Sequence, residues 1–247
     1  MVTKPHGTVY LVGAGPGASD LITVRGLRLL QCADIVVFDA LADGDLLVGL
    51  QARCIDVGKR SGQHGMKQSE INELLIHSAR QGFSVVRLKG GDPYVLGRGS
   101  EEGIALAAAG VDCQVVPGIS SSYAAPLLAG IPLTHRGTAD GFTVVSAHPH
   151  EGDDLPSIPA YCARHTLVVL MGVASLPVWI GQLKQLAYPM DLPIAFVTWA
   201  ARADQTVLVT TLERCLADAA TASLRSPSVA IVGRVVQLRS QLLGSAT

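Results

Sequence analysis

Aromatic residues are scarce in this chain, which has four Phe, two Trp and five Tyr among 247 residues. Nearly half of the residues are nonetheless hydrophobic, at 49%, so the core must be built largely from Val, Leu, Ile and Ala. Such an aliphatic composition is typical of buried parallel strands and of the helices that cover them. The length allows two domains of about 100 to 150 residues each. We therefore expect an α/β protein.

The chain also lacks an excess of charge of either sign. Its formal net charge is −1, and no block of like charges occurs. Nucleic-acid surfaces and basic membrane helices depend on such blocks, so we expect neither kind of partner. The longest uncharged run, TLVVLMGVASLPVWIGQL, contains two Gly and a Pro. It predicts a strand, a loop and a helix in place of a membrane span.

The cysteines indicate neither disulfides nor a metal site. They are odd in number, widely spaced and without a C-x-x-C or Cys/His ligand pattern. The amino-terminal residues contain no apolar segment typical of a signal peptide. We therefore expect a cytoplasmic protein that binds no metal. The five cysteines are Cys32, Cys54, Cys113, Cys162 and Cys215.

Short β-branched runs alternate with helical patterns through the first half of the chain. The runs are TVYLVGA, DIVVFD, RCIDVGK, FSVVRLKG and DCQVVPG. Among the helical patterns, one begins near Ser69, which is expected to act as its N-cap. This alternation predicts an open, largely parallel sheet with right-handed crossovers.

Strands follow one another with fewer helices in the second half, where a mixed sheet is expected. The runs are FTVVSAH, TLVVLMG, PIAFVTW, TVLVTTL and SVAIVGRVVQL. Turn residues concentrate between Thr134 and Gly141, so we expect one domain over residues 1–137 and another over 138–247. His135 and Arg136 lie at this boundary, where a ligand cleft is expected, and two cations there indicate an acidic substrate.

Polar residues follow several of the strands expected in the first half. Asp39 follows the second strand, Lys59 the third, and Arg87, Lys89 and Asp92 end or follow the fourth. Ligands of open α/β sheets bind beyond the carboxyl ends of the strands. Each residue has an ordinary alternative, such as a helix N-cap for Asp39 or a solvated surface for the cations. Their convergence on one edge favours a functional site.

The stretch YLVGAGPGASD raises the alternative of a dinucleotide site. Gly13, Gly15 and Ala18 satisfy the G-x-G-x-x-G/A pattern of such sites. Pro16, however, removes a backbone N–H from the loop, and no acidic residue ends a strand about 20 residues later. The loop therefore favours a ligand without a pyrophosphate. An NAD-dependent oxidoreductase remains the alternative from a different class.

Taken in order, these motifs resemble those of the tetrapyrrole methylases, and among them the uroporphyrinogen-III C-methyltransferases. The matching segments are VYLVGAGPG, VGKR, VVRLKGGDP, GRGSEE, VVPGISS, AGIPLTHRG and LMG. The resemblance extends from about residue 7 to residue 238, and RLKGGDP and AGIPLTHRG are specific for the family. It implies two α/β domains of the tetrapyrrole methylase fold, an active site in the cleft between them, and a homodimer.

The resemblance also implies a reaction. Methyl groups of S-adenosylmethionine would be transferred to C2 and then C7 of uroporphyrinogen III, giving S-adenosylhomocysteine and precorrin-2 for sirohaem and cobalamin synthesis. A sister methylase that acts on a later precorrin is the nearest alternative, and a non-catalytic tetrapyrrole-binding module is another. Departures from the family pattern leave affinity and the methylated carbon open. They include Ala40, Ala147, Leu170, Thr198 and Trp199.

Site residues are implied by the same matches. Asp39 falls at the position of a proposed proton acceptor, Lys59 at that of a proposed donor, and Arg87 also matches. Cations suited to the eight substrate carboxylates are Arg60, Arg98, His135 and Arg136, in addition to Lys59 and Arg87. The cofactor positions would be Pro16, Gly90, Gly91, Asp92, Val95, Ser120, Ser121, Met171 and Ala200.

Overall fold

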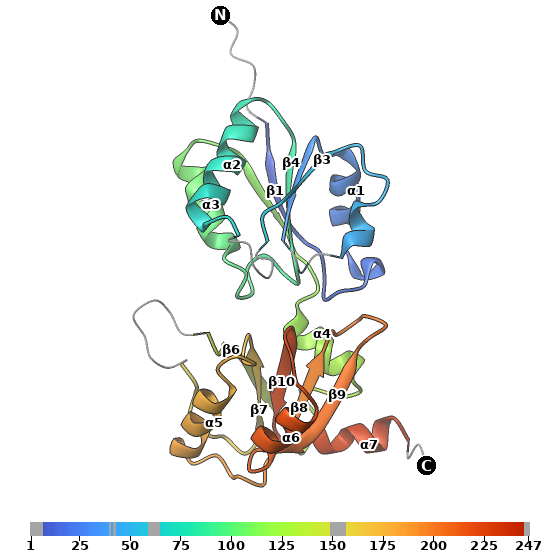
Figure 1. Ribbon diagram of the computed structural model, residues 1–247, viewed down its shortest axis with the longest axis vertical. Helices are drawn as coiled ribbons and strands as arrows, with labels where there is room; N and C mark the ends of the chain where they lie inside the picture. Colours follow the sequence, from blue (N-terminus) through green and yellow to red (C-terminus); the bar gives the residue numbers. More distant parts are fainter. Residues whose placement is uncertain (1–6, 40, 42, 59–64, 149–156, 245–247) are drawn as a thin grey trace, which may run out of the picture. The chain divides into compact units, whose positions relative to one another are not determined.

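The computed structural model describes residues 7–39, 41, 43–58, 65–148 and 157–244 (Figure 1). Backbone contacts divide the chain into two compact units, Met1–Ser120 and Ser121–Thr247. Each unit contains one five-stranded sheet together with helices. The expected pair of α/β sheets is therefore confirmed.

The division between the units falls earlier in the chain than the expected boundary between residues 137 and 138. Helix α4 (Ser121–Leu128) packs on the second sheet, where Ala125 shares a hydrophobic cluster with Val168. The turn residues that suggested the boundary form a turn inside the second unit, closed by backbone hydrogen bonds between His135 and Ala139. Burial of the apolar face of α4 thus decides which unit it joins.

The first unit is built on an all-parallel sheet with the strand order β3-β2-β4-β1-β5. The three central strands are almost entirely buried, as parallel strands between two helix layers should be. All five expected strands are present, and the expected parallel sheet is confirmed. The strands are β1 (Val9–Gly13), β2 (Ile35–Phe38), β3 (Arg53–Asp56), β4 (Val85–Lys89) and β5 (Cys113–Val116).

Helices cover both faces of the first sheet (Figure 1). Val36 and Val37 are neighbours in β2 and point to opposite faces, so that Val36 packs with Leu30 of α1, and Val37 packs with Leu75 of α2 and Leu106 of α3. The elements are η1 (Ser19–Leu21), α1 (Val24–Cys32), η2 (Gly44–Leu47), α2 (Gln68–Arg80) and α3 (Gly99–Ala108).

The start of α2 differs from the expectation that Ser69 caps it. Gln68 is the first helical residue and Lys67 occupies the N-cap position. The carboxylate of Glu70 accepts a hydrogen bond from the Lys67 backbone N–H at 2.7 Å. A glutamate at the third helical position satisfies the chain end in this way, so the Ser69 hydroxyl is not needed as a cap.

The second unit contains a mixed sheet, as expected, with the order β6-β7-β10-β8-β9. β6 and β7 are parallel, whereas β10 runs antiparallel to both β7 and β8, and β8 antiparallel to β9. The strands are β6 (Gly141–Ser146), β7 (His165–Leu170), β8 (Pro193–Thr198), β9 (Thr206–Thr211) and β10 (Ser228–Val232).

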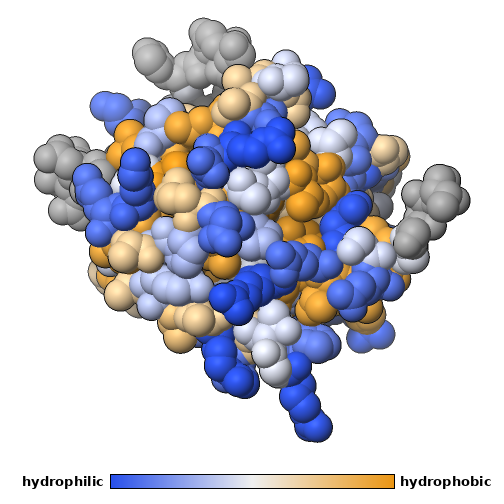
Figure 2. Space-filling view, turned by 90° about the horizontal axis from the view of Figure 1, so that it is seen from below, coloured by the Kyte–Doolittle hydropathy of each residue, from blue (hydrophilic) through white to orange (hydrophobic). Residues whose placement is uncertain are grey.

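Two hydrophobic clusters cover the two faces of the second sheet. On one face, Trp179 of α5 (Leu176–Gln185) and Cys215 of α6 (Cys215–Thr221) pack with strand side chains. On the other, α4 is joined by Val235 of η3 (Arg234–Gln237), which α7 (Leu238–Leu242) follows. Figure 2 shows that hydrophilic side chains interrupt the hydrophobic surface on the face seen from below.

The long uncharged run of residues 166–183 forms most of β7, a loop and most of α5, as expected. Helices within the described ranges are all too short or too polar to cross a membrane.

The cysteines differ strongly in exposure, and this predicts their reactivity. Cys215 is fully buried, its thiol donates to the Leu212 carbonyl, and burial raises its pKa to about 11. Cys32, Cys54 and Cys162 are exposed. Because the thiolate is the reactive form, we expect an alkylating reagent at about pH 8 to modify these three in the folded protein and Cys215 only after unfolding. Peptide mass spectrometry measures this, and equal labelling of Cys215 and Cys32 in the folded protein would contradict it.

Candidate functional site

Three carboxyl-end loops of the first sheet meet at glycines, which we call the glycine rim: Gly13, Gly15, Gly91 and Gly118. Gly15 N–H donates to the Gly91 carbonyl at 3.2 Å, and Gly91 N–H donates to the Gly15 carbonyl at 2.7 Å. A Cβ added at Gly13 would lie 2.5 Å from the Gly118 Cα, and one at Gly118 would lie 2.2 Å from the Gly91 oxygen. Side chains are therefore sterically excluded where the loops after β1, β4 and β5 pack backbone to backbone.

The glycine rim does not resemble a phosphate cradle. The backbone N–H of Gly15 is bonded within the rim, whereas a phosphate site needs free N–H groups at a helix N-terminus. The following α-helix begins only at Val24, where the Thr23 hydroxyl accepts the Gly26 N–H at 3.1 Å. The structure thus adds no support to the dinucleotide alternative.

Asp92 joins two loops of the rim. Its Oδ1 accepts the Tyr94 N–H at 2.8 Å and its Oδ2 accepts the Gly118 N–H at 3.0 Å. Both carboxylate oxygens thus serve the main chain and fix the path of the loop after β4. In that loop Gly90 faces Leu41, whose Cβ would lie 2.7 Å from an added Cβ, and Val95 is exposed.

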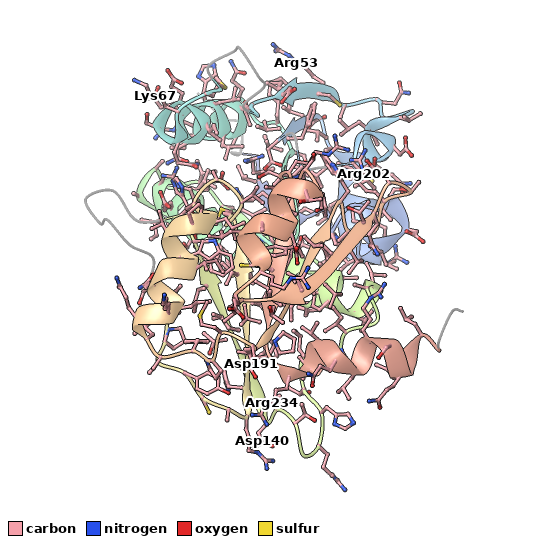
Figure 3. All side chains as sticks on the ribbon, turned by 60° about the horizontal axis from the view of Figure 1, so that its bottom comes forward. Arg53, Lys67, Asp140, Asp191, Arg202 and Arg234 are labelled. Carbon is pink, nitrogen blue, oxygen red and sulfur yellow. The ribbon has the colours of Figure 1, made fainter. Side chains whose placement is uncertain are left out.

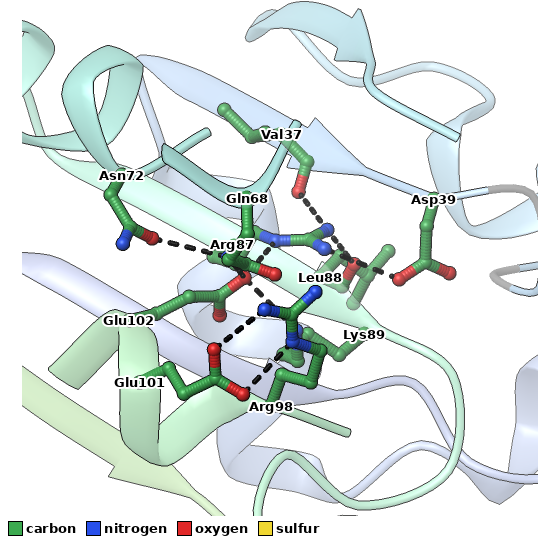
Figure 4. A network of polar contacts seen from close by, with 10 residues as sticks. All are labelled: Val37, Asp39, Gln68, Asn72, Arg87, Leu88, Lys89, Arg98, Glu101 and Glu102. Carbon is green, nitrogen blue, oxygen red and sulfur yellow. Dashed lines mark hydrogen bonds and ion pairs between the residues drawn. The ribbon is translucent and has the colours of Figure 1, made fainter. Parts of the chain in front are cut away.

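Arg87 lies on β4 with its guanidinium buried at the same edge (Figure 4). The residue is 3% exposed, and all three nitrogens have acceptors within the first unit. Nε donates to Glu102 Oε1 at 3.1 Å, Nη1 donates to the carbonyls of Val37 and Leu88 at 3.4 and 3.1 Å, and Nη2 donates to Asp39 Oδ2 at 3.4 Å. The structure therefore places Arg87 behind Asp39 as a buried cation whose nitrogens are bonded within the first unit.

Glu102 of α3 forms ion pairs with two buried cations, Arg87 and Lys89. It is fully buried, and its Oε1 accepts from Arg87, from Lys89 Nζ at 3.0 Å and from Gln68 Nε2 at 3.2 Å. Lys89 is 4% exposed, and burial together with the Arg87 charge lowers its pKa, while Glu102 opposes that shift. Glu102 was missed in the sequence, although a glutamate within the apolar helix GSEEGIALAA was a signal.

Asp39 directly follows β2, and its side chain is 27% exposed. Its Oδ1 accepts the Leu41 N–H at 3.2 Å, so one oxygen stabilises the turn that follows. Its Oδ2 faces Arg87 at 3.4 Å, a length at which the hydrogen bond is weak. The carboxylate is therefore held in place while part of it still reaches solvent, as a proton acceptor requires.

Arg98 stands at the start of α3 in a left-handed conformation, with φ of 58°. Its guanidinium donates two hydrogen bonds to Glu101, from Nε to Oε1 at 2.9 Å and from Nη2 to Oε2 at 2.6 Å. The bond to Glu101 raises the pKa of Arg98, and the same bond lowers the pKa of Glu101. Both side chains are more than half exposed, so an incoming carboxylate can compete with Glu101 for Arg98.

Strained backbone marks one edge of the second sheet. β7 and β8 run in the same direction, because β10 lies between them and is antiparallel to both. Directly beyond their carboxyl ends, Met171, Trp199 and Ala201 all have positive φ, at 58°, 52° and 65°. Such conformations are costly for residues other than glycine and cluster at functional sites. Ala200 lies between two of these residues, and Met171 is 51% exposed.

His135 and Arg136 lie at the opposite edge of the second sheet from Met171. Their turn packs where β6 and β7 begin, since the Thr166 hydroxyl donates to the Leu133 carbonyl and Asp140 follows the turn. Figure 3 shows Asp140 at this end of the second unit and Arg202 toward the other. A six-residue strand spans about 20 Å, so the structure does not bring these cations to the strained edge.

The remaining expected positions are less informative. Pro16 is half-buried in the loop after β1, Ser120 is buried at the end of the first unit, and Ser121 begins α4. Lys59 and Arg60 lie outside the described residues. No group of three or more His, Cys, Asp or Glu suited to a metal ion occurs in the described part of the chain.

Curated proteins of several bacteria are similar to this chain. It is 44% identical over 245 residues to a uroporphyrinogen-III C-methyltransferase of Synechocystis, covering 96% of this chain and 93% of that protein. It is 43% identical over 242 residues to a sirohaem synthase of Azotobacter vinelandii, covering 97% of this chain and 52% of that one. The chain thus spans about half the length of several curated relatives.

Solved structures resemble it as well. A uroporphyrin-III C-methyltransferase of Thermus thermophilus complexed with S-adenosylhomocysteine has a TM-score of 0.81 at 39% identity, with 94% of each chain covered. A cobalt precorrin-4 methyltransferase has a TM-score of 0.79 at 26% identity, covering 93% of this chain and 95% of that one. The sequence model of the family Tetrapyrrole (Corrin/Porphyrin) Methylases matches residues 8–215 of this chain. The chain therefore belongs to the tetrapyrrole methylase family.

Proposed function

We propose that this protein transfers methyl groups from S-adenosylmethionine to C2 and C7 of uroporphyrinogen III, giving precorrin-2. The observation that carries the proposal is the partly exposed carboxylate of Asp39, which lies next to buried charged residues at the carboxyl edge of the sheet in a member of the tetrapyrrole methylase family. The names of the Synechocystis and Thermus relatives support uroporphyrinogen III as the substrate.

The chemistry of the substrate sets what the chain must do. When bound, S-adenosylmethionine supplies an electrophilic methyl group on a sulfonium centre. An electron-rich pyrrole carbon forms the new C–C bond, the methyl–sulfur bond breaks, and the electron pair stays on sulfur. The macrocycle thereby gains one positive charge and must release one proton. The protein therefore needs to position the ring and accept a proton, and it needs no metal for either task.

Asp39 is the proposed proton acceptor. Its carboxylate would stabilise the positive charge that develops on the ring and then take the released proton. Lys59, which lies outside the described residues, is the proposed proton donor. Arg98 and Arg60 are proposed to bind substrate carboxylates. Arg87 is proposed to orient Asp39 through its hydrogen bond to the carboxylate. His135 and Arg136 gain no support for a substrate role because they lie far from Met171.

Features of both units suit the proposed cofactor. Gly91, Met171, Trp199 and Ala201 all have positive φ, and such backbone conformations cluster at functional sites. Val95 and Met171 are exposed apolar residues, which suit an adenosine and a methionine side chain. The proposed cofactor positions are Pro16, Gly90, Gly91, Asp92, Val95, Ser120, Ser121, Met171 and Ala200.

The proposal extends to the setting of the reaction. We infer a cytoplasmic homodimer whose product feeds sirohaem synthesis and, as the precorrin methyltransferase among its structural relatives suggests, cobalamin synthesis. A sister reaction on a later corrinoid is the second candidate, favoured by the same structural relative.

Product analysis tests the proposed function. The protein is incubated anaerobically with S-adenosylmethionine and enzymatically generated uroporphyrinogen III, and the added methyl groups are counted by mass spectrometry. We expect two methyl groups and a matching amount of S-adenosylhomocysteine. Methylation of a later precorrin, with uroporphyrinogen III left unchanged, would transfer the assignment to the sister reaction.

A further inference from the structure

Four ionisable side chains at the carboxyl edge of the first sheet form one connected, charge-balanced group. Arg87 and Lys89 supply two positive charges, and Glu102 and Asp39 supply two negative ones. Glu102, Arg87 and Lys89 are 0%, 3% and 4% exposed, whereas the Asp39 side chain is 27% exposed. Asp39 is thus the member that can reach a ligand, and the other three lie behind it (Figure 4).

The contacts of Glu102 are unusual for a buried carboxylate. One oxygen, Oε1, accepts hydrogen bonds from Arg87, Lys89 and Gln68, while Oε2 has no hydrogen-bond partner among the described residues. An unpaired buried oxygen is costly, and a buried ion pair is by itself a weak source of stability. The arrangement therefore favours a role in setting charge and orientation over a role in holding the fold together.

Arg87 transmits this arrangement to Asp39. Glu102 holds its Nε, and the Val37 and Leu88 carbonyls hold its Nη1, so Nη2 is the nitrogen directed at Asp39. The distance of 3.4 Å keeps the guanidinium from fully neutralising the carboxylate. Without the Glu102 charge, both buried cations would act on Asp39 alone.

We propose that Glu102 and Lys89 are positioning residues for the methyl-transfer reaction, which act through Arg87 to orient the Asp39 carboxylate and set its strength as a base. This inference rests on the proposed role of Asp39 as proton acceptor. It assigns a function to two side chains that touch neither substrate nor cofactor.

Other charged groups around this site are few in the described part of the chain. Asp39 faces Arg87 and Lys89. Glu102 faces these two cations from α3, and its charge also acts on Arg98 at the start of that helix and on the Cys113 thiol in β5. Neutralising Glu102 therefore makes the net charge around Asp39 more positive, whereas neutralising Lys89 makes it more negative.

The test uses three variants of the whole protein: Glu102→Gln, Lys89→Met and the double variant. For each, kcat is measured against pH with uroporphyrinogen III. A base loses activity as pH falls through its pKa. Removing the Glu102 charge leaves excess positive charge near Asp39, which favours the ionised form of the Asp39 carboxyl group. The acid limb of the pH profile of kcat should therefore move to lower pH. Removing the Lys89 charge moves that limb to higher pH. We expect displacements of roughly one pH unit in opposite directions, and an acid limb close to its wild-type position in the double variant, in which the charges again balance.

The kinetic constants separate positioning from binding. Glu102→Gln should lower kcat at neutral pH by about tenfold, because the base is weaker and less well oriented, with KM nearly unchanged. Leu106→Val serves as a control for lost stability. Leu106 is fully buried one turn further along α3 and carries no charge. This control should lower the melting temperature and leave the acid limb in place.

The outcomes are distinguishable. Acid limbs that move in the same direction, or that stay in place in both single variants, would overturn the inference and leave Glu102 a structural residue. If Glu102→Gln does not fold, Lys89→Met and the double variant carry the comparison. Carbon-13 NMR titration of the Asp39 carboxyl provides a readout independent of the substrate. Opposite shifts of that titration in an enzyme inactive on uroporphyrinogen III would retain the positioning role and reject the proposed function.

Discussion

Replacing Asp39 with asparagine is expected to lower kcat by about 10² to 10⁴ while the KM values for both substrates change little. The change is nearly isosteric and removes the negative charge that would accept the proton from the methylated ring. Asparagine can still accept the Leu41 N–H that Asp39 Oδ1 now binds at 3.2 Å, so the turn should survive. Steady-state kinetics under anaerobic conditions measure the effect.

Asp43 offers a matched control for this experiment. Its Oδ1 accepts the Asp45 N–H at 3.3 Å at the start of η2, so it makes the same kind of carboxylate-to-backbone contact in the same loop. Asp43→Asn should leave kcat unchanged. If Asp39→Asn keeps kcat within about threefold of wild type, Asp39 is a turn residue and the proton acceptor lies elsewhere.

Replacing Gly91 with valine is expected to abolish binding of S-adenosylhomocysteine. Gly91 has φ of 67°, a conformation in which a β-branched residue is strained, and its carbonyl and N–H both bond to Gly15. A branched side chain there would displace the loop after β4 from the glycine rim. Isothermal titration calorimetry measures the affinity, and circular dichroism reports whether the fold is retained.

Gly110 provides the control for backbone strain alone. It has nearly the same φ, 69°, but lies in the turn between α3 and β5, where an added Cβ meets nothing within 4 Å. Gly110→Val should lose roughly 1–2 kcal/mol of stability and still bind the ligand. Wild-type affinity in Gly91→Val would remove the rim from the cofactor site.

The strands and the edge that carries the polar residues could be predicted from local patterns. Each strand of the first sheet is a short β-branched run, and parallel strands place their carboxyl ends on one edge, so Asp39 and Arg87 were expected at the same edge. The burial of Arg87 could not be predicted. It depends on Glu102, which comes from a helix 15 residues further along the chain, and strand sequence alone does not show which face receives such a partner.

Local sequence patterns also could not predict where helices begin or where surface cations lie. Glu70 satisfies the start of α2 in place of Ser69, because a longer carboxylate side chain reaches back to the same N–H group. His135 and Arg136 belong to the motif AGIPLTHRG, but their turn packs at the edge where β6 and β7 begin. Which edge a loop joins is decided by the tertiary packing of Ile131 and Ala139.

The interlocked glycine rim has a consequence for local unfolding. The loops after β1, β4 and β5 cannot separate one at a time, because Gly13, Gly91 and Gly118 are in backbone contact and Asp92 bonds across two loops. We therefore expect the rim to open as one cooperative unit, with its amide protons sharing one opening event. A ligand that orders any of the three loops slows that event for all of them, so the free energy of binding is distributed over strands that the ligand does not contact.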